Sequence, residues 1–400
     1  MPKGASCRTP LAHQLKRRAD SMIYMDYNAT APVHPKVLEA FLPFYRESFG
    51  NPSSIHMAGR RAKGAIEEAR EKVARFLGCE PVEVIFTSSG TEADNMAVKG
   101  IASSLRGRGN HIITTRVEHP AVLNTMLHLE QEGFEITRLD VDRDGIPDLA
   151  RLEACITGRT ILISVMHANN ETGTILPVME IGAIAGRHRV VFHCDAVQAA
   201  GKIPMDCREI NAGLLAISGH KMGAPQGIGA LVVRRGVKLH PFIHGGSQER
   251  NRRAGTENVA GIVALGRACE LAQDSLLTES ARIGALRDLL ELGIISTIPD
   301  VRINGHKEKR LPNTSNISFA GCEADSLLAN LDLEGIMVSS GAACSSGTLR
   351  VSHVLSAMGI EPAMAKASLR FSLGRENSEA DLDHLLGVLP GIVERLRKSR

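Results

Sequence analysis

Aromatic side chains are scarce in this sequence: its 400 residues include no tryptophan and only three tyrosines. So few rings argue against a surface that stacks nucleic-acid bases. The net charge is only +3, and the lysines and arginines are scattered rather than clustered. No apolar run approaches the ~20 residues that span a bilayer. We therefore expect neither a nucleic acid nor a membrane as a partner.

The eight cysteines form no CxxC pair and show no metal-ligand spacing. Cysteines without such patterns are typical of reduced thiols inside a cell. Residues 1–21 are polar and basic and lack the apolar core of a secretion signal. We therefore expect a flexible N-terminal tail and a cytoplasmic location.

Apolar, strand-like segments alternate with helical segments over the first two thirds of the chain. Near-continuous apolar strands separated by helices predict a mainly parallel sheet that is covered on both faces. The polar residues to inspect are those that follow the strands, because ligands of such sheets bind beyond the carboxyl ends of the strands. The predicted strands are 84–87, 111–115, 135–139, 160–166, 190–195, 214–217 and 229–233.

The pattern changes after about residue 276, where short strands alternate with longer helices. The predicted strands there are 315–319, 336–339 and 367–372, and the helices are 281–292, 325–333 and 379–398, the last with a kink at Pro390. Since 400 residues are many for one core, we expect an α/β fold with two domains. The large domain covers 36–275, and a smaller α+β domain combines 22–35 with 276–400.

A lysine follows the sixth of these strands. Lys221 ends the stretch Ser218-Gly219-His220-Lys221, directly before a glycine-rich run. A lysine at the end of a buried strand is poorly solvated, which lowers its pKa and makes the amine nucleophilic. Ser218 and His220 beside it can donate hydrogen bonds to an anion. An ordinary loop explains the same four residues, so this stretch needs support from elsewhere.

Other strand ends carry polar groups that suit one cofactor. Small residues from Ser88 onward, including Gly90 and Thr91, begin a helix and can cradle a phosphate. His119 precedes a helix-starting proline, and Asn170 lies in a polar turn. Asp195 ends a buried strand, where a carboxylate is costly unless it is paired, for example with a protonated pyridine nitrogen. Helix caps, turns and structural salt bridges are the alternatives for each residue taken alone.

The order of these groups along the chain is more specific than any one of them. From Ile23 to its C-terminus the sequence resembles the class V aminotransferase family of pyridoxal 5'-phosphate (PLP) enzymes with the type I fold. Within that family it resembles the cysteine desulfurases, and among them the NifS branch. The matching segments are 26–30, 49–54, 87–92, 118–120, 169–173, 193–198, 218–221, 248–258, 339–344 and 370–374.

The resemblance implies a role for each matching residue. Lys221 holds PLP as a Schiff base and carries a proton, and His119 stacks on the ring and acts as acid or base. Asp195 pairs with the pyridine nitrogen. Arg370 binds the carboxylate of the substrate, as a guanidinium can. Asn170 binds both the substrate and the cofactor. The other cofactor-binding residues are Gln198 at the phenolic oxygen, and Gly90, Thr91, Ser218, His220 and, from the second subunit of a homodimer, Thr256 at the phosphate.

Cys344 decides which reaction is expected. It lies in a run of serine, glycine and alanine, which suits a mobile loop better than a core. The resemblance implies that L-cysteine becomes L-alanine while its sulfur passes to Cys344 as a persulfide. The sulfur then goes to an iron–sulfur scaffold of the NifU or IscU kind, which makes Cys344 the one candidate for a transient iron–sulfur contact.

Several questions stay open at this stage. The segment 248–258 favours a nitrogenase-related role over a housekeeping one. Arg350 and Val351 stand where many relatives carry Glu-Pro, which leaves the preferred acceptor open. Selenocysteine lyase and class V aminotransferase activities use the same site, and in the second Cys344 would be dispensable. A non-catalytic sulfur carrier is disfavoured because Lys221, Asp195, His119 and Cys344 are present together.

Overall fold

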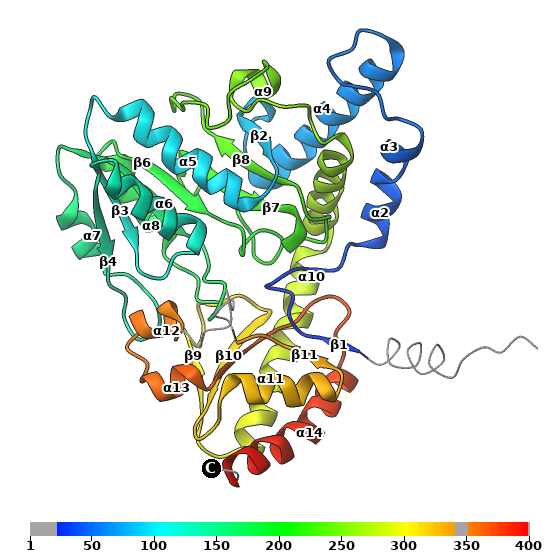
Figure 1. The fold of residues 1–400 in the computed structure, drawn as a ribbon, viewed down its shortest axis with the longest axis vertical. Coiled ribbons are helices and arrows are strands. Elements are labelled where there is room, and N and C mark those ends of the chain that lie inside the picture. The colour runs from blue at the N-terminus through cyan, green and yellow to red at the C-terminus, as the bar shows by residue number, and fades with distance from the viewer. Residues whose placement is uncertain (1–21, 341–350, 399–400) are drawn as a thin grey trace, which may run out of the picture.

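A seven-stranded sheet forms the centre of the larger part of the molecule (Figure 1). The computed structural model describes residues 22–340 and 351–398. The strand order is β2-β8-β7-β6-β5-β3-β4, and β3 to β7 run parallel, whereas β8 is antiparallel to both of its neighbours. The strands are β2 Val84–Thr87, β3 His111–Thr115, β4 Glu135–Leu139, β5 Thr160–Met166, β6 Val191–Asp195, β7 Leu214–Ser218 and β8 Gly229–Val233. The predicted mainly parallel α/β sheet is confirmed, with β6 starting one residue later than expected and β7 ending one residue later.

Helices cover both faces of this sheet. Leu214 and Ala216 of β7 point toward the core under α5 and α6, whereas Leu215 and Ile217 point toward the core under α4, α8 and α10. This alternation explains why the strand is apolar at every position, since both faces are buried. The helices are α4 Met57–Leu77, α5 Gly90–Leu105, α6 Pro120–Gln131, α7 Leu149–Cys155, α8 Val178–Arg187, α9 Gln248–Asn251 and α10 Val259–Thr297, with 3-10 turns η1 Pro81–Glu83 and η2 Gly219–Lys221.

Proline and glycine set two helix boundaries near the N-terminus. The helix expected from Pro35 to residue 45 is two helices, α2 Pro35–Phe41 and α3 Pro43–Arg46. Pro43 has no N–H to continue the first helix, so a new one starts there. Gly78 ends α4 in the left-handed conformation (φ 68°), as expected for its C-cap.

A second core lies in the lower part of Figure 1. There a three-stranded antiparallel sheet, β12-β10-β9, packs with α11, α14 and the C-terminal half of α10, and a two-stranded parallel pair joins β1 to β11. The elements are β1 Ile23–Tyr24, β9 Val301–Asn304, β10 Thr314–Phe319, α11 Ala324–Leu333, β11 Ile336–Met337, α12 His353–Ala357, α13 Pro362–Lys366, β12 Ser368–Ser372 and α14 Glu379–Lys398. β11 is two residues shorter than expected, and α14 continues past Pro390.

Helix α10 connects the two cores. The segment expected as a helix over 281–292 lies in the second half of this 39-residue helix, whose first half packs in the large core and whose second half packs in the small one. The helix therefore passes through residue 275, where we expected the large domain to end. The division into two domains stays a proposal.

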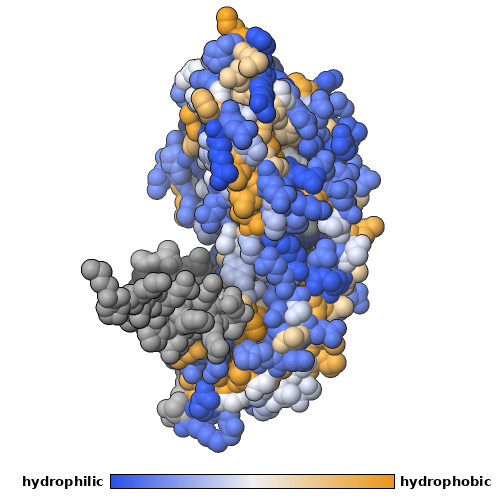
Figure 2. Space-filling view, turned by 90° about the vertical axis from the view of Figure 1, so that its right-hand side faces the viewer, coloured by the Kyte–Doolittle hydropathy of each residue, from blue (hydrophilic) through white to orange (hydrophobic). Residues whose placement is uncertain are grey.

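One side of the molecule carries exposed apolar side chains. Figure 2 shows a mostly hydrophilic face with hydrophobic side chains at its top, over the connection between α3 and α4. Phe49, Ile55 and Met57 of this connection and of the start of α4 are exposed. Among the residues that the structure describes, no helix is long and apolar enough to cross a membrane.

Candidate active site

A pocket of about 350 Å³ lies at the carboxyl ends of β5, β6 and β7, and Arg370 of the three-stranded sheet closes it from the other side. The structure thus brings together residues from segments far apart in the sequence. Ten of the predicted site residues line this one pocket: Gly90, Thr91, His119, Asn170, Asp195, Gln198, Ser218, His220, Lys221 and Arg370.

Lys221 projects into the pocket from η2, directly after β7. Its Nζ donates to the backbone carbonyls of Asn28 and Ala29, both at 2.6 Å. Burial, and next the positive charge of Arg370, lower the pKa of Lys221 to about 8. An appreciable fraction of this amine is therefore unprotonated near neutral pH and can act as a nucleophile or a base.

Asp195 ends β6 and lines the floor of the pocket. Within the described residues, its carboxylate accepts one hydrogen bond, on Oδ1 from the Val197 N–H at 2.9 Å. Burial is the main cause that raises the pKa of Asp195 to about 7. A cation placed beside this carboxylate would restore the charged form, so Asp195 suits a positively charged partner in the pocket.

Helix α5 starts at the edge of the pocket and offers an anion site. Ser89 caps it by accepting from the Glu92 N–H (3.1 Å), which leaves Gly90 and Thr91 at the helix start facing the pocket. A Cβ on Gly90 would lie 2.7 Å from Cγ2 of Val197. Glycine therefore keeps the helix N-terminus close to the pocket, where its N–H groups and dipole favour a phosphate.

His119 and Arg370 stand at other walls of the pocket. Desolvation in the pocket, and next the charge of Lys221, lower the pKa of His119 to about 4, so the imidazole is uncharged near neutral pH. Arg370 donates to the Asn170 carbonyl (3.0 Å) and to Asp26 Oδ1 (2.7 Å). Arg370 lines the pocket, where its positive charge suits an anionic ligand.

Two predicted site residues are not among the described residues that line this pocket. Thr256 lines a separate pocket of about 120 Å³ with Ser88 and Gly227, so it does not reach the Lys221 pocket of its own chain. Cys344 lies outside the described residues, although Ser339, five positions earlier, lines the Lys221 pocket. Within residues 22–340 and 351–398, no group of His, Cys, Asp or Glu side chains could hold a metal ion.

The pocket fits PLP on three independent observations. The N-terminus of α5, which Gly90 keeps close to the pocket, suits the phosphate. The buried Asp195 carboxylate, which accepts one hydrogen bond in the described chain, suits the pyridine nitrogen. The Lys221 amine, with a pKa of about 8, suits the aldehyde. The cavity of about 350 Å³ is of the size that small-molecule sites have.

Sequence reasoning missed two polar residues of this pocket, Asn28 and Asp94. Asn28 lies in the matching segment 26–30, but no role was given to it. Its carbonyl accepts from Lys221 and its side chain bonds to Thr314 Oγ1 at 2.9 Å. Asp94 follows Gly90 by about one helical turn, and this spacing predicts that both residues lie on the same face of α5.

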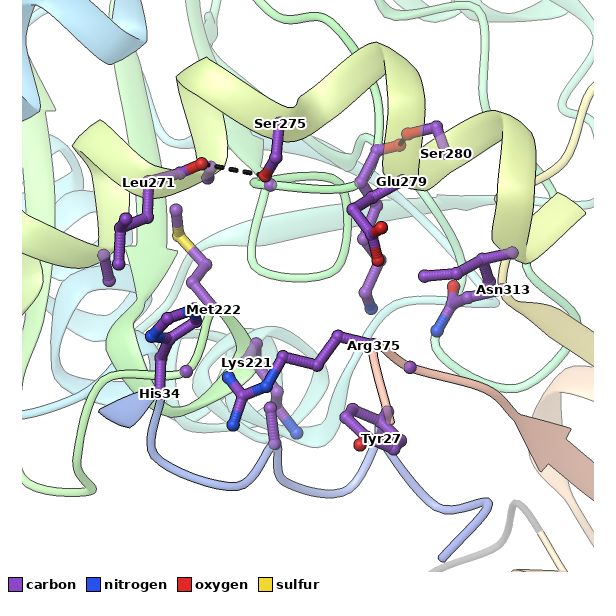
Figure 3. Close-up of a pocket in the computed structure, with 18 of the residues that line it drawn as sticks. Tyr27, His34, Lys221, Met222, Leu271, Ser275, Glu279, Ser280, Asn313 and Arg375 are labelled. Atoms are coloured by element: carbon purple, nitrogen blue, oxygen red, sulfur yellow. Dashed lines mark hydrogen bonds between the residues drawn. The ribbon is translucent and has the colours of Figure 1, made fainter. Parts of the chain in front are cut away.

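A second, larger cavity of about 550 Å³ lies between α10 and the segment that follows β1. Figure 3 shows Ser275 and Glu279 of α10 facing it from one side and His34, Met222 and Arg375 from the other, with Lys221 behind. Lys221 lines both cavities, so the wall between them is thin at this residue.

Comparisons with known proteins agree with this fold. The aminotransferase class-V family model matches residues 23–385. The chain is 52% identical to cysteine desulfurase IscS of Dictyoglomus turgidum over 375 residues, which are 94% of this chain and 95% of that protein.

Solved structures show the same likeness. A NifS-like protein superposes with a TM-score of 0.89 at 39% identity, over 94% of this chain and all (100%) of that one. A protein described as SspA in complex with cysteine superposes with a TM-score of 0.78 at 36% identity, over 88% of this chain and 98% of that one. This chain belongs to the aminotransferase class-V family, among its pyridoxal-phosphate-dependent cysteine desulfurases.

Proposed function

We propose that this cysteine desulfurase converts L-cysteine into L-alanine and takes up the sulfur on Cys344 as a persulfide. One observation carries the proposal: Lys221, Asp195 and Arg370 share a pocket that Ser339 also lines, five residues before Cys344. The relative described in complex with cysteine supports the substrate.

The pocket residues divide into cofactor-holding and substrate-holding groups. Asp195 pairs with the pyridine nitrogen, Gln198 with the phenolic oxygen, and His119 lies against the ring. When bound, PLP supplies the electron sink for a carbanion at the substrate's α carbon. The phosphate is held by Gly90, Thr91, Ser218 and His220. Arg370 binds the substrate carboxylate beside Asn170.

Lys221 moves the proton at the substrate's α carbon. Its amine, with a pKa of about 8, is well matched to taking up and returning a proton near neutral pH. His119 lines the same pocket, and we propose that it acts as acid or base for a second proton.

The transfer of sulfur to Cys344 needs no external oxidant. The Cys344 thiolate attacks the substrate sulfur, a new S–S bond forms, and the substrate C–S bond breaks. The electron pair of that bond stays with the substrate carbon, which takes up a proton to become the methyl group of alanine.

Two further proposals concern the protein that accepts the persulfide sulfur and the oligomeric state of the enzyme. We propose an iron–sulfur scaffold of the NifU or IscU kind as the acceptor, with the nitrogenase-related role that segment 248–258 favours, in the cytoplasm. We also propose a homodimer in which Thr256 completes the partner's phosphate site. Its position outside the Lys221 pocket of its own chain and the exposed Phe49, Ile55 and Met57 support this arrangement.

The test compares three substrates with the intact enzyme and two variants. The enzyme should form alanine from L-cysteine, Cys344→Ala should not, and Cys155→Ala, a partly buried cysteine of α7, should behave as the wild type. Faster turnover of L-selenocysteine would favour the lyase. Amino transfer to a 2-oxo acid that survives Cys344→Ala would overturn the proposal in favour of an aminotransferase.

A further inference from the structure

Lys202 joins two side chains of the active-site wall without lining the pocket itself. It lies four residues after Gln198, in the turn that follows β6, and it faces the larger cavity. Its Nζ donates to Gln198 Oε1 at 2.6 Å and to Asn28 Oδ1 at 2.9 Å. Within the described residues it forms no salt bridge with a carboxylate. Its role is therefore not to neutralise an acid.

The orientation of both amides is fixed by groups that can only accept. Gln198 Nε2 donates to the backbone carbonyl of Asn28 at 3.0 Å, so Oε1 of this amide must face Lys202. Asn28 Nδ2 donates to the backbone carbonyl of Asn170 at 3.2 Å, so its Oδ1 must also face Lys202. An amine donates whether or not it is protonated, so this arrangement holds for both charge states of Lys202.

No other donor replaces Lys202 at Gln198. Asn28 Oδ1 also accepts from Asn313 Nδ2 at 3.0 Å, but within the described residues the Lys202 amine is the sole donor to Gln198 Oε1. Gln198 is buried, so the loss of that donor would leave a buried amide oxygen unpaired. Rotation of the amide would then turn an oxygen, rather than an N–H group, toward the pocket.

We propose that Lys202 is a positioning residue, which holds the Gln198 amide with its NH₂ group toward the cofactor's phenolic oxygen and steadies the Asn28 carbonyl that receives Lys221. The proposal rests on the role of Gln198 in the proposed function. A phenolate oxygen needs a donor, and Lys202 ensures that the amide presents one. Asn28 links both effects, because its backbone carbonyl accepts from Gln198 and from Lys221.

The test measures the cofactor rather than turnover. PLP is titrated into cofactor-free Lys202→Met, and its dissociation constant and the pH titration of the visible absorbance band of the lysine-bound cofactor are recorded. Loss of one oriented hydrogen bond should weaken PLP binding about tenfold. It should also shift the midpoint of the band's titration, because the phenolic oxygen loses its donor. Lys202→Arg, which keeps donors beside a cavity with room for it, should restore most of both.

A double-mutant cycle distinguishes failure of the Lys202 proposal from failure of the proposed role of Gln198. If Lys202 acts through Gln198, then Lys202→Met should add little to the effect of Gln198→Leu. If Gln198→Leu alone leaves affinity and band unchanged, the role of Gln198 fails. If Gln198→Leu changes them but Lys202→Met does not, Lys202 is only structural and the present inference is overturned.

Two further variants serve as controls for the effect of Lys202→Met. Lys36→Met removes another lysine of the larger cavity that has no contact with Gln198, and it should leave both readouts unchanged. If Lys202→Met does not fold, Lys202→Gln is used, whose shorter polar side chain should shift both readouts in the same direction. An unshifted band in the folded variant would contradict the proposal.

Discussion

Asp94 Oδ1 lies 3.4 Å from Nε2 of His193, and both side chains are buried. Burial raises the pKa of Asp94 to about 8 and lowers that of His193 to about 4, so neither group is charged near neutral pH. His193 Nδ1 pairs with the Ser164 hydroxyl at 2.9 Å. Asp94 and His193 therefore form a neutral pair, and Asp195 is the carboxylate that we propose pairs with the cofactor.

Asp94→Asn should reduce the loss of stability of the cofactor-free protein as the pH rises. The folded-state pKa of Asp94 is raised, so its stabilising contribution is complete below the unfolded-state value and is lost as the pH rises through about 8. Asparagine does not titrate, so the variant lacks this pH-dependent contribution to stability. Its melting temperature should therefore fall less than that of the wild type between about pH 5 and pH 8. Glu71→Gln, an exposed change on α4, is the control. Equal pH slopes for Asp94→Asn and wild type would contradict a protonated Asp94.

Capture of PLP by the cofactor-free enzyme should accelerate as the pH rises through about 8, because the neutral Lys221 amine is the nucleophile. Arg370→Gln removes the charge that, after burial, most lowers this pKa, so the midpoint should move to higher pH. Stopped-flow absorbance across the pH range measures both. A midpoint that is unchanged in Arg370→Gln would show that Arg370 does not tune Lys221.

Gly90→Ala should weaken PLP binding by at least about tenfold and destabilise the protein by roughly 1–3 kcal/mol. The added methyl group would lie 2.7 Å from Val197 and 3.2 Å from Ser218, which forces α5 away from the pocket. Gly64→Ala is a matched control on α4, where a Cβ meets nothing within 4 Å. This control should stabilise the helix by about 0.5–1 kcal/mol. Unchanged PLP affinity in Gly90→Ala would contradict the phosphate site at α5.

Arg70→Ala should be strongly destabilising and should weaken the proposed dimer. Arg70 binds Glu249 through two bonds of 2.8 Å, and their side chains are only 4% and 3% exposed. The pair holds α9, where Glu249 and Arg250 adopt left-handed backbone angles, a few residues before Thr256.

Removing one partner of a buried pair costs roughly 3–5 kcal/mol, against about 0–1 kcal/mol for an exposed pair such as Arg208 and Glu80. Denaturant unfolding and light scattering on Arg70→Ala and Arg208→Ala test this difference. Equal losses in the two variants would show that the buried pair has no special role.

The sequence predicts the residues at strand ends better than those that support them. Asp195 and Lys221 follow apolar segments whose position in a parallel sheet is fixed by burial on both faces, so their meeting at one edge follows from the pattern. Lys202 and Asn28 meet Gln198 through a turn and through a segment some 170 positions away, which no local period encodes. The predicted helix boundary near the N-terminus is wrong because a single residue, Pro43, starts a new helix there.

Mass spectrometry of Cys344 after a single exposure of the holoenzyme to L-cysteine tests the central claim most directly. The account predicts that the peptide containing Cys344 gains the mass of one sulfur atom, that a reductant removes this sulfur, and that alanine appears in equal amount. Alanine formed at the normal rate with no added sulfur on Cys344, or in Cys344→Ala, would contradict the account.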